Sequence, residues 1–502
     1  MIKHFLCLLS FALPLIAAEK PRAIVIFYTD DLGYNDTSTY GCDKVPCPNL
    51  DKLAEEGLRF TDAHSTHSVC TPSRYSLLTG EYAWRRKGTG ILPGDAKLIL
   101  PTEQERATLP SLMKKAGYRT AVIGKWHLGL GRGSAPTDWN RHISPGPAEV
   151  GFEHSFILAA TGDRVPCVYL KNGHVVNLDP SDPIEVSYKE PFEGEPLGST
   201  HPELVKHHAR SFGPQHNCSV IDGIPRIGYM KGGHAARWKD QDMADRLTDE
   251  AINFIAESAA LRRPIFLYFA TNDIHVPRDP HKRFVGKSGM GIRGDVTLQM
   301  DDCLGRLRQA LNKYGYSDCL FIFSSDNGPV INDGYLDGSI RDCRGHNPVA
   351  PMNAGQWRDG RLSGGKYGLM EGSTRVPFIV SWPGHTERGD SSALVSQIDL
   401  ARSLAELAGA TIPKGALPDS RNQLPALLGK DRTGAPHIIE SANGSPKALR
   451  CGQYKYYRRA KKEHLYDLSN DLQERSNIAQ QHPDIAARMN RLLTELTGPS
   501  RQ

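Results

Sequence analysis

Long apolar runs are missing from this 502-residue sequence, since no segment reaches the roughly 18 uninterrupted apolar residues needed to cross a bilayer. A strong charge of either sign is missing too, because 61 basic residues face 56 acidic ones, for a formal charge of +5. These absences exclude a multi-span membrane protein and give no case for a nucleic-acid-binding protein. Repeats and low-complexity blocks are also absent. With 39% hydrophobic and 23% charged residues, the composition is that of a folded globular protein.

The N-terminal segment has the layout of a cleavable secretory signal. Lys3 precedes an apolar run from Phe5 to Ile16, and two alanines follow. A transmembrane anchor or a buried helix is the alternative, but this run of about a dozen residues contains Pro14 and is too short for a bilayer core of about 30 Å. We therefore expect residues 1–18 to be a signal peptide, and the protein to be exported, periplasmic or secreted, with no membrane span.

Beyond this segment, short apolar runs alternate with helical segments. The β-prone runs are Ala23–Tyr28, Thr120–Ile123, Ile265–Ala270, Leu320–Phe323 and Phe378–Trp382. Strands that are apolar on both sides imply a sheet covered on both faces. The alternation with helices predicts an α/β fold with a doubly wound, largely parallel sheet.

Two helices between these runs have recognisable ends. One is expected over Leu50–Glu56, with Asn49 as its cap and Gly57 past its end. The other is expected over Ser111–Ala116 after a proline, which favours the first turn of a helix.

The character of the sequence changes after about residue 430. Short polar strands such as Gln453–Tyr457 precede an amphipathic helix over Pro483–Leu496. We therefore expect one large domain over residues 19–430 and a small α+β subdomain over residues 431–502.

Polar side chains follow four of the apolar runs. They are Asp30 and Asp31, Lys125 and His127, Asp273 and His275, and Asp326 and Asn327. In open α/β sheets, ligands bind outside the carboxyl ends of the strands. A single acidic pair after a strand is commonly a cap or a turn, so the prediction of a site depends on four strand ends meeting at one edge.

Four of these residues offer only oxygen donors: Asp30, Asp31, Asp326 and Asn327. Three carboxylates held close together repel one another and need a counter-ion, and all-oxygen coordination suits Ca²⁺ or Mg²⁺. Zinc would require His or Cys ligands. The sequence has no EF-hand loop, so ordinary turn residues remain the alternative.

The sharpest local motif is the run from Cys70 to Arg74, CTPSR, which leads into a helical segment over Ser73–Leu78 that ends near Gly80. Cys70 would then lie at the amino end of a helix, where the dipole and free N–H groups favour an anion and would lower the pKa of a thiol. Arg74, one turn on, could hold an oxyanion. A disulfide partner is the alternative for Cys70 in an exported protein.

Together these motifs resemble the type I, formylglycine-dependent sulfatase family of the alkaline-phosphatase superfamily. CTPSR is similar to the family signature Cys-x-Pro-x-Arg. Five further segments match in the family's order: TDDLGYND at 29–36, GKWHLG at 124–129, SSDNG at 324–328, GGK at 364–366 and LYDL at 465–468. The resemblance spans about residues 21–480 and implies the alkaline-phosphatase-like fold.

The resemblance implies a mechanism. A maturation enzyme would oxidise Cys70 to Cα-formylglycine, whose hydrated aldehyde attacks sulfur and forms a covalent sulfo-enzyme intermediate. Ca²⁺, in preference to Mg²⁺, would be held by the modified Cys70 and the four oxygen-donor residues. Arg74 and Lys125 would orient the diol, and His127 would be its base. His275, with Lys366, would stabilise or protonate the leaving alkoxide.

Export and this resemblance together favour a sulfated carbohydrate as the substrate, with 6-O- or 4-O-sulfate on a galactose-type sugar. Asp163, Arg164 and His234 lie outside the matching motifs, where they would either read sugar hydroxyls or form loop salt bridges. A phosphonate monoester or phosphodiester hydrolase on the same scaffold is the closest alternative. A non-catalytic sulfated-glycan-binding protein is another.

Two further features leave alternatives open. The basic run over 455–462 is either a patch for anionic glycans or a solvated face. The sequence has ten cysteines; if Cys7 leaves with the signal and Cys70 is modified, an even number remains, which permits disulfides without specifying them.

Overall fold

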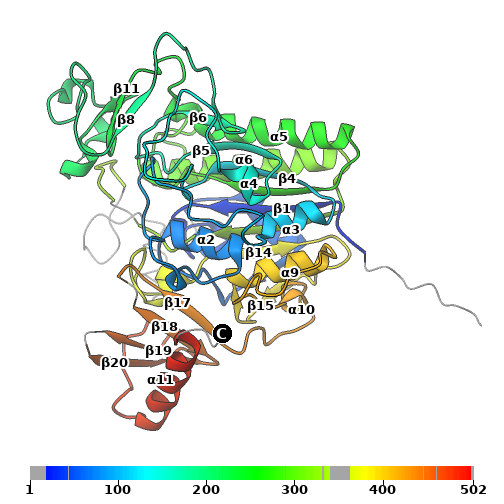
Figure 1. The fold of residues 1–502 in the computed structure, drawn as a ribbon. Helices are drawn as coiled ribbons and strands as arrows, with labels where there is room; N and C mark the ends of the chain where they lie inside the picture. Colours follow the sequence, from blue (N-terminus) through cyan, green and yellow to red (C-terminus); the bar gives the residue numbers. More distant parts are fainter. Residues whose placement is uncertain are drawn as a thin grey trace, which may run out of the picture.

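The computed structural model describes residues 19–498, apart from 43, 212, 289, 331–332, 340–361, 445 and 460. The expected signal peptide lies outside the described residues, as do Cys7 and Cys343. A ten-stranded sheet forms the centre of the described chain, with helices on both of its faces (Figure 1). None of the helices in this part of the chain combines the length and the apolar character that crossing a bilayer requires.

The middle of the sheet consists of five buried parallel strands. In spatial order they are β13 (Cys319–Ser325), β1 (Ala23–Thr29), β12 (Ile265–Ala270), β4 (Arg119–Lys125) and β5 (His154–Leu158). Beyond β13 lie β14 (Phe378–Ser381), β2 (Leu58–Phe60) and β15 (Gly389–Ser391), and beyond β5 lie β6 (Tyr169–Lys171) and β7 (His174–Val175). The strands β14, β6 and β7 run antiparallel to their inner neighbours. The predicted α/β fold with a largely parallel sheet is confirmed.

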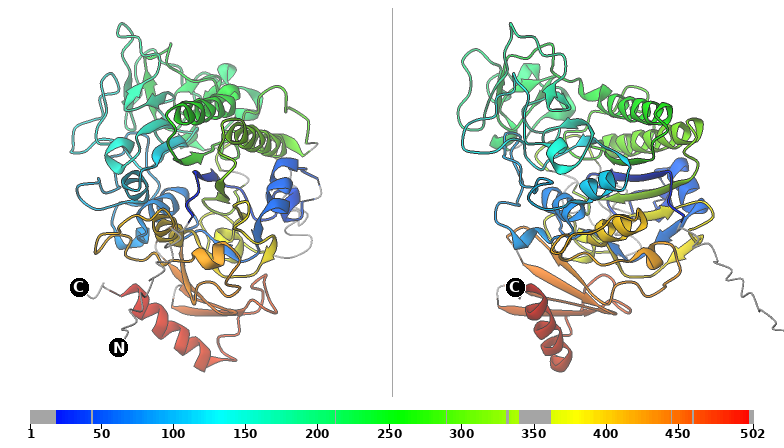
Figure 2. Two further views of the ribbon diagram at one scale, coloured as in Figure 1. Left: turned by 90° about the vertical axis from the view of Figure 1, so that its right-hand side faces the viewer. Right: turned by 45° about the vertical axis from the view of Figure 1, so that its right-hand side comes forward.

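The helices form two layers, one on each face of the sheet (Figures 1 and 2). One layer contains α1 (Pro48–Glu56), α5 (Met243–Ala260) and α6 (Gly291–Lys313), and the other contains α2 (Cys70–Thr79), α3 (Leu109–Lys115) and α9 (Leu400–Leu407). The short helices are α4 (Pro147–Val150), α8 (Glu371–Thr374) and α10 (Leu424–Leu427). Three small two-stranded sheets pair β3 (Ala63–His64) with β16 (Val395–Ser396), β8 (Glu185–Ser187) with β11 (Tyr229–Lys231), and β9 (Val220–Ile221) with β10 (Ile224–Pro225).

The predicted start of α1 is wrong by two residues. Cys47 occupies the N-cap position, and Asn49 lies inside the first turn. The Asn49 side chain instead donates a hydrogen bond to Asp301 on α6, at 2.9 Å. A tertiary partner has therefore replaced the local capping role that the residue type predicted.

The C-terminal part forms a second, antiparallel sheet of β17 (Ile438–Ser441), β18 (Lys447–Cys451), β19 (Tyr454–Arg459) and β20 (Lys462–Asp467). The helix α11 (Pro483–Thr497) packs across it, as the red helix of Figure 1 shows. Leu449, Leu465 and Met489 form a small core between this helix and the sheet. The domain boundary at residue 430 stays a prediction.

A buried network of charged side chains joins the small sheet to the main body. Its acids are Asp62, Glu371, Glu440 and Glu474, and its bases are His64, Arg375, Arg450 and Lys455. The Lys455 ammonium lies 3.0 Å from Glu371 and 3.1 Å from Glu440, with all three side chains fully buried. Lys455 therefore belongs to the interior and not to a surface patch, whereas Arg458 and Arg459 of the same basic run are exposed.

Replacing Lys455 with methionine is expected to lower the free energy of unfolding by about 3–5 kcal/mol, because it leaves Glu371 and Glu440 buried without their shared cation. Chemical denaturation measures this change. Lys462→Met, on the exposed part of β20, is the matched control and should change stability by less than about 0.5 kcal/mol. Equal effects of the two variants would contradict the role assigned to Lys455.

Candidate active site

The register of the central strands brings the predicted site residues to one edge. Thr29 of β1 pairs with Ser325 of β13, so the next residues, Asp30 and Asp326, leave the sheet side by side. On the far side of β12, two strands from β1, β4 needs Gly124 just before Lys125. Gly124 has a φ of +107°, and a Cβ there would lie 1.8 Å from the carbonyl oxygen of Ala270 on β12. Close strand packing therefore delivers both carboxylates and the Lys125 ammonium to the same point.

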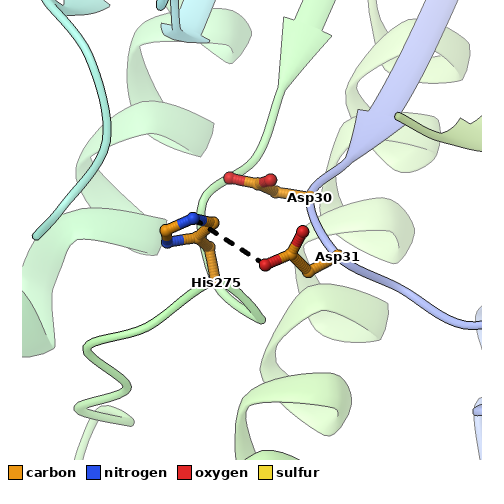
Figure 3. Close-up of side chains that lie close together, drawn as sticks. All are labelled: Asp30, Asp31 and His275. Atoms are coloured by element: carbon orange, nitrogen blue, oxygen red, sulfur yellow. Dashed lines mark ion pairs between the residues drawn. The ribbon is translucent and has the colours of Figure 1, made fainter. Parts of the chain in front are cut away.

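The four predicted oxygen-donor residues form one buried cluster. The Asn327 amide donates to Asp31 at 2.7 Å, and the backbone N–H of Asp31 donates to Asp326 at 3.3 Å. Figure 3 shows Asp30 and Asp31 side by side after β1, with His275 approaching from the loop that follows β12; His275 Nε2 lies 3.7 Å from Asp31 Oδ2. Asp31 has a φ of +57°, a conformation that costs a non-glycine residue about 1–3 kcal/mol and is concentrated at functional sites.

This cluster fits a hard cation. Asp30 Oδ1 and Asn327 Oδ1 are buried and have no hydrogen-bond partner within the described structure. Ligand atoms of Asp30, Cys70 and Asp326 lie within 4.8 Å of one another, and so do those of Asp30, Asp31 and His275. Burial raises the pKa of Asp30 to about 8 in spite of Lys125. A bound cation would satisfy the unpartnered oxygens and offset the cost of burying several carboxylates together.

Cys70 is the first residue of α2, as predicted, and the helix ends at Gly80 in the left-handed conformation. Its Sγ lies 3.4 Å from His127 Nδ1, while His127 Nε2 lies 2.9 Å from the carbonyl oxygen of Leu92. The Leu92 carbonyl accepts only from a protonated Nε2, so Nδ1 faces the sulfur as an acceptor. The expected low thiol pKa is wrong: burial raises the pKa of Cys70, and nearby Lys125 and Lys366 do not compensate for it.

Arg74 and Lys125 form buried ion pairs with the carboxylates of Asp326 and Asp30. The Arg74 guanidinium donates through Nε and Nη2 to Asp326 Oδ2, at 3.0 and 2.8 Å. The Lys125 ammonium donates to Asp30 Oδ2 at 2.5 Å. All four side chains are fully buried, so these ion pairs fix the orientation of the cluster.

Lys366 lies on the opposite side of the cluster beside His275. Its ammonium donates to Asp31 at 2.9 Å and to Asp333 at 3.1 Å, and it lies 3.3 Å from His275 Nε2. Burial would lower the pKa of Lys366, but Asp31 and Asp333 raise it well above its ordinary value. Burial together with Lys366 and Lys125 lowers the pKa of His275 well below its usual range. Lys366 therefore carries the proton of this pair.

A pocket of about 280 Å³ opens above these groups. Cys70, His127, His275 and Lys366 line its floor together with Asp163, Arg164, His216, Asp333 and Tyr367. Asp163 and Arg164, two of the residues predicted either to bind sugar hydroxyls or to form loop salt bridges, therefore line the pocket. The third, His234, is exposed, and its Nδ1 lies 2.9 Å from Asp182.

Asp333, Tyr367 and His216 also line the pocket but were not among the predicted site residues. Asp333 accepts from both Lys366 and the Tyr367 hydroxyl, and His216 lies 3.7 Å from Asp163. These residues follow no apolar run and belong to no recognised motif, so only the folded loops reveal them.

The cysteines do not support a disulfide role for Cys70. Free thiols are carried by Cys47, Cys70, Cys167, Cys218, Cys303, Cys319 and Cys451. The even number of cysteines permitted several disulfides, but none forms at these positions.

Comparison with known proteins bears on this geometry. The sulfatase family model matches residues 22–410. The N-acetylgalactosamine-6-O-sulfatase of Bacteroides thetaiotaomicron is 44% identical over 493 residues, which cover 95% of this chain and 93% of that protein. Arylsulfatase A of Homo sapiens is 30% identical over 452 residues, which cover 88% and 75%. A solved structure from work on glycosaminoglycan metabolism by Bacteroides thetaiotaomicron has a TM-score of 0.89 at 44% identity, covering 95% of this chain and 99% of that one.

Proposed function

The chain belongs to the sulfatase family and is a sulfuric ester hydrolase. We propose that it is an exported enzyme that removes 6-O-sulfate from N-acetylgalactosamine or a related galactose-type sugar during the breakdown of glycans. The observation that carries this proposal is the meeting of Cys70, a buried oxygen-donor cluster and Lys366 at one pocket. Residues 1–18 would direct export.

Cys70, once converted to formylglycine by a maturation enzyme, would supply a hydrated aldehyde as the nucleophile. Asp30, Asp31, Asp326 and Asn327 would hold Ca²⁺, which would supply positive charge for the sulfate oxygens. Arg74 and Lys125 keep the carboxylates in place through the ion pairs at Asp326 and Asp30. Their buried geometry supports a positioning role at the nucleophile.

Proton transfer at the nucleophile is assigned to His127. Burial, Lys125 and Arg164 lower the pKa of His127 well below its usual range, so the imidazole is neutral and its Nδ1 can accept a proton from the group at position 70. The contact of 3.4 Å between Nδ1 and Cys70 Sγ supports this direction.

Stabilisation of the leaving oxygen is assigned to Lys366 with His275. His275 Nδ1 lies 2.5 Å from the carbonyl of Val276, which makes Nδ1 the donor and leaves Nε2 to accept from Lys366. Lys366 then donates to the alkoxide as the ester bond breaks, and His275 orients the ammonium.

The pocket and the comparisons support the proposed substrate class. Asp163, Arg164 and His216 line the pocket, with Asp163 2.6 Å from Arg164 and 3.7 Å from His216. A carboxylate, a guanidinium and an imidazole held together in this way support binding of sugar hydroxyls. The 44% identical relative carries the name of a 6-O-sulfatase of N-acetylgalactosamine, which favours 6-O- over 4-O-sulfate.

Sulfate release from a panel of sugars with one defined sulfate tests the proposal. We expect 6-O-sulfated N-acetylgalactosamine and galactose to exceed their 4-O-sulfated isomers and 6-O-sulfated glucosamine by at least about tenfold in kcat/KM, a difference of about 1.4 kcal/mol in transition-state binding. Higher turnover of a phosphodiester than of a sulfate ester with the same leaving group would instead favour the phosphonate or phosphodiester alternative.

A further inference from the structure

A second hollow, larger than the catalytic pocket, lies between the chain segment that follows α2 and the turn between β17 and β18. Its volume is about 510 Å³, against about 280 Å³ for the pocket at Cys70. Its walls come from the 3₁₀ helix η2 (Ala83–Arg85), from residues 86–91 and from residues 441–444. The C-terminal sheet therefore contributes one wall of this flanking hollow.

The flanking hollow adjoins the catalytic pocket. Val69 and Pro72, on either side of Cys70 at the start of α2, line the hollow, while Cys70 lines the pocket. Ile91 lines both. A ligand that places one unit above Cys70 can therefore extend past Ile91 into the flanking hollow.

The lining of the flanking hollow is basic. It contains Arg85, Arg86 and Lys87, and no acidic side chain among the residues that the structure describes. The charge of Arg85 is compensated by Asp419, at 2.7 Å. The net charge of the hollow therefore depends on Arg86 and Lys87.

Arg86 and Lys87 are not fully compensated. Arg86 Nε lies 3.3 Å from Glu81 Oε2, but the same oxygen is only 2.6 Å from Arg106, so one carboxylate serves two guanidinium groups. The Arg86 side chain is 46% exposed. Lys87 is exposed and has no ion-pair partner within the described chain. The flanking hollow therefore carries excess positive charge that a ligand can reach.

We propose that the flanking hollow binds an anionic substituent, a carboxylate or a second sulfate, on the sugar next to the one that loses its sulfate. This assignment rests on the proposed function, because it gives the substrate chain its place beyond the catalytic pocket. Guanidinium groups bind carboxylate and sulfate oxygens in pairs, and a lysine ammonium adds a mobile point charge. The enzyme is thus matched to acidic glycans.

Four substrates separate the sources of the anion: the 6-O-sulfated monosaccharide, its disaccharide with a neighbouring uronic acid, the same disaccharide with the carboxyl group reduced, and one with a sulfated neutral neighbour. We expect the matured wild-type enzyme to favour an anionic neighbour over the reduced one by about tenfold in kcat/KM. The double variant Arg86→Ala/Lys87→Ala should keep its activity on the monosaccharide and lose this preference to within about twofold. The anion that shows the larger preference is the one the hollow selects.

Lys52→Ala/Lys115→Ala is the matched control, because it removes two exposed positive charges from α1 and α3, outside the hollow. It should keep the full preference at the same ionic strength. A wild-type enzyme without any preference, or a double variant at Arg86 and Lys87 that keeps it, overturns the inference.

Calorimetry with the unsulfated uronic-acid disaccharide makes the comparison without turnover, and the double variant should bind at least about tenfold more weakly. If no sulfated sugar is hydrolysed, the proposed function fails, but calorimetry still tests anion binding in the flanking hollow. Equal affinity of the wild type and the double variant for the disaccharide would refute the inference.

Discussion

Replacing Cys70 with alanine is expected to lower kcat for sulfate release by about 10⁴-fold or more, the scale on which the loss of a nucleophile acts in other hydrolases. The pocket is small and its floor is already occupied by Cys70, His127 and Lys366. No other described cysteine or serine lines that pocket, so no neighbouring thiol or serine hydroxyl can take over the attack. Steady-state sulfate release measures the effect.

Cys303→Ala is the control for this prediction, because Cys303 is a buried free thiol on α6, away from the pocket. It should leave kcat within about threefold of wild type. Mass spectrometry of the peptide that contains position 70 adds an independent readout, since the proposed nucleophile requires formylglycine there. Active enzyme with an unmodified cysteine at that position would refute the mechanism.

Removal of divalent cations is expected to reduce kcat by at least about 100-fold, and Ca²⁺ should restore it. The same ion should stabilise the fold, by about 2.7 kcal/mol at a Ca²⁺ concentration 100 times its Kd, because it binds the folded cluster and not the unfolded chain. Its proposed ligands include Asp30, Asp31 and Asp326, whose buried carboxylates otherwise depend on ion pairs with Arg74, Lys125 and Lys366. Thermal unfolding with and without Ca²⁺ measures the second effect, independently of activity.

Asn327→Ala should reduce the stabilisation by Ca²⁺, since it removes the Asn327 oxygen that has no protein partner. Asn140→Ala is the matched control: Asn140 bonds the backbone of Ile184 and lies outside the cluster. Calcium stabilisation of the same size in Asn327→Ala and wild type would refute the assignment of this ligand.

The central strands and the residues directly after them were predictable from the sequence. Fully apolar runs such as Ile265–Ala270 can only be buried strands or buried helix segments, and their short length favours strands. A parallel sheet places the following residues at one edge, so Asp30 and Asp326 could be brought together without knowing the loops.

Predictions failed where a distant partner outweighed a local preference. Asn49 has the chemistry of a helix cap, yet Asp301 on α6 binds its side chain. Cys70 has the helix position that lowers a thiol pKa, yet burial raises that pKa. The basic run begins at Lys455 and suggested a surface, but three buried glutamates surround the Lys455 ammonium.

The α/β architecture, the residues at the strand ends and the motifs that resemble a sulfatase could all be identified from the sequence, because they depend on local pattern and spacing. The folded chain was needed to show that Asp333 and Tyr367 contact one another beside Lys366 and that the acceptor nitrogen of His127 faces Cys70. It was also needed to show that Arg86 and Lys87 line a hollow beside the pocket. These arrangements join residues that are far apart in the chain or oriented by burial and by hydrogen bonds. No local pattern carries that information.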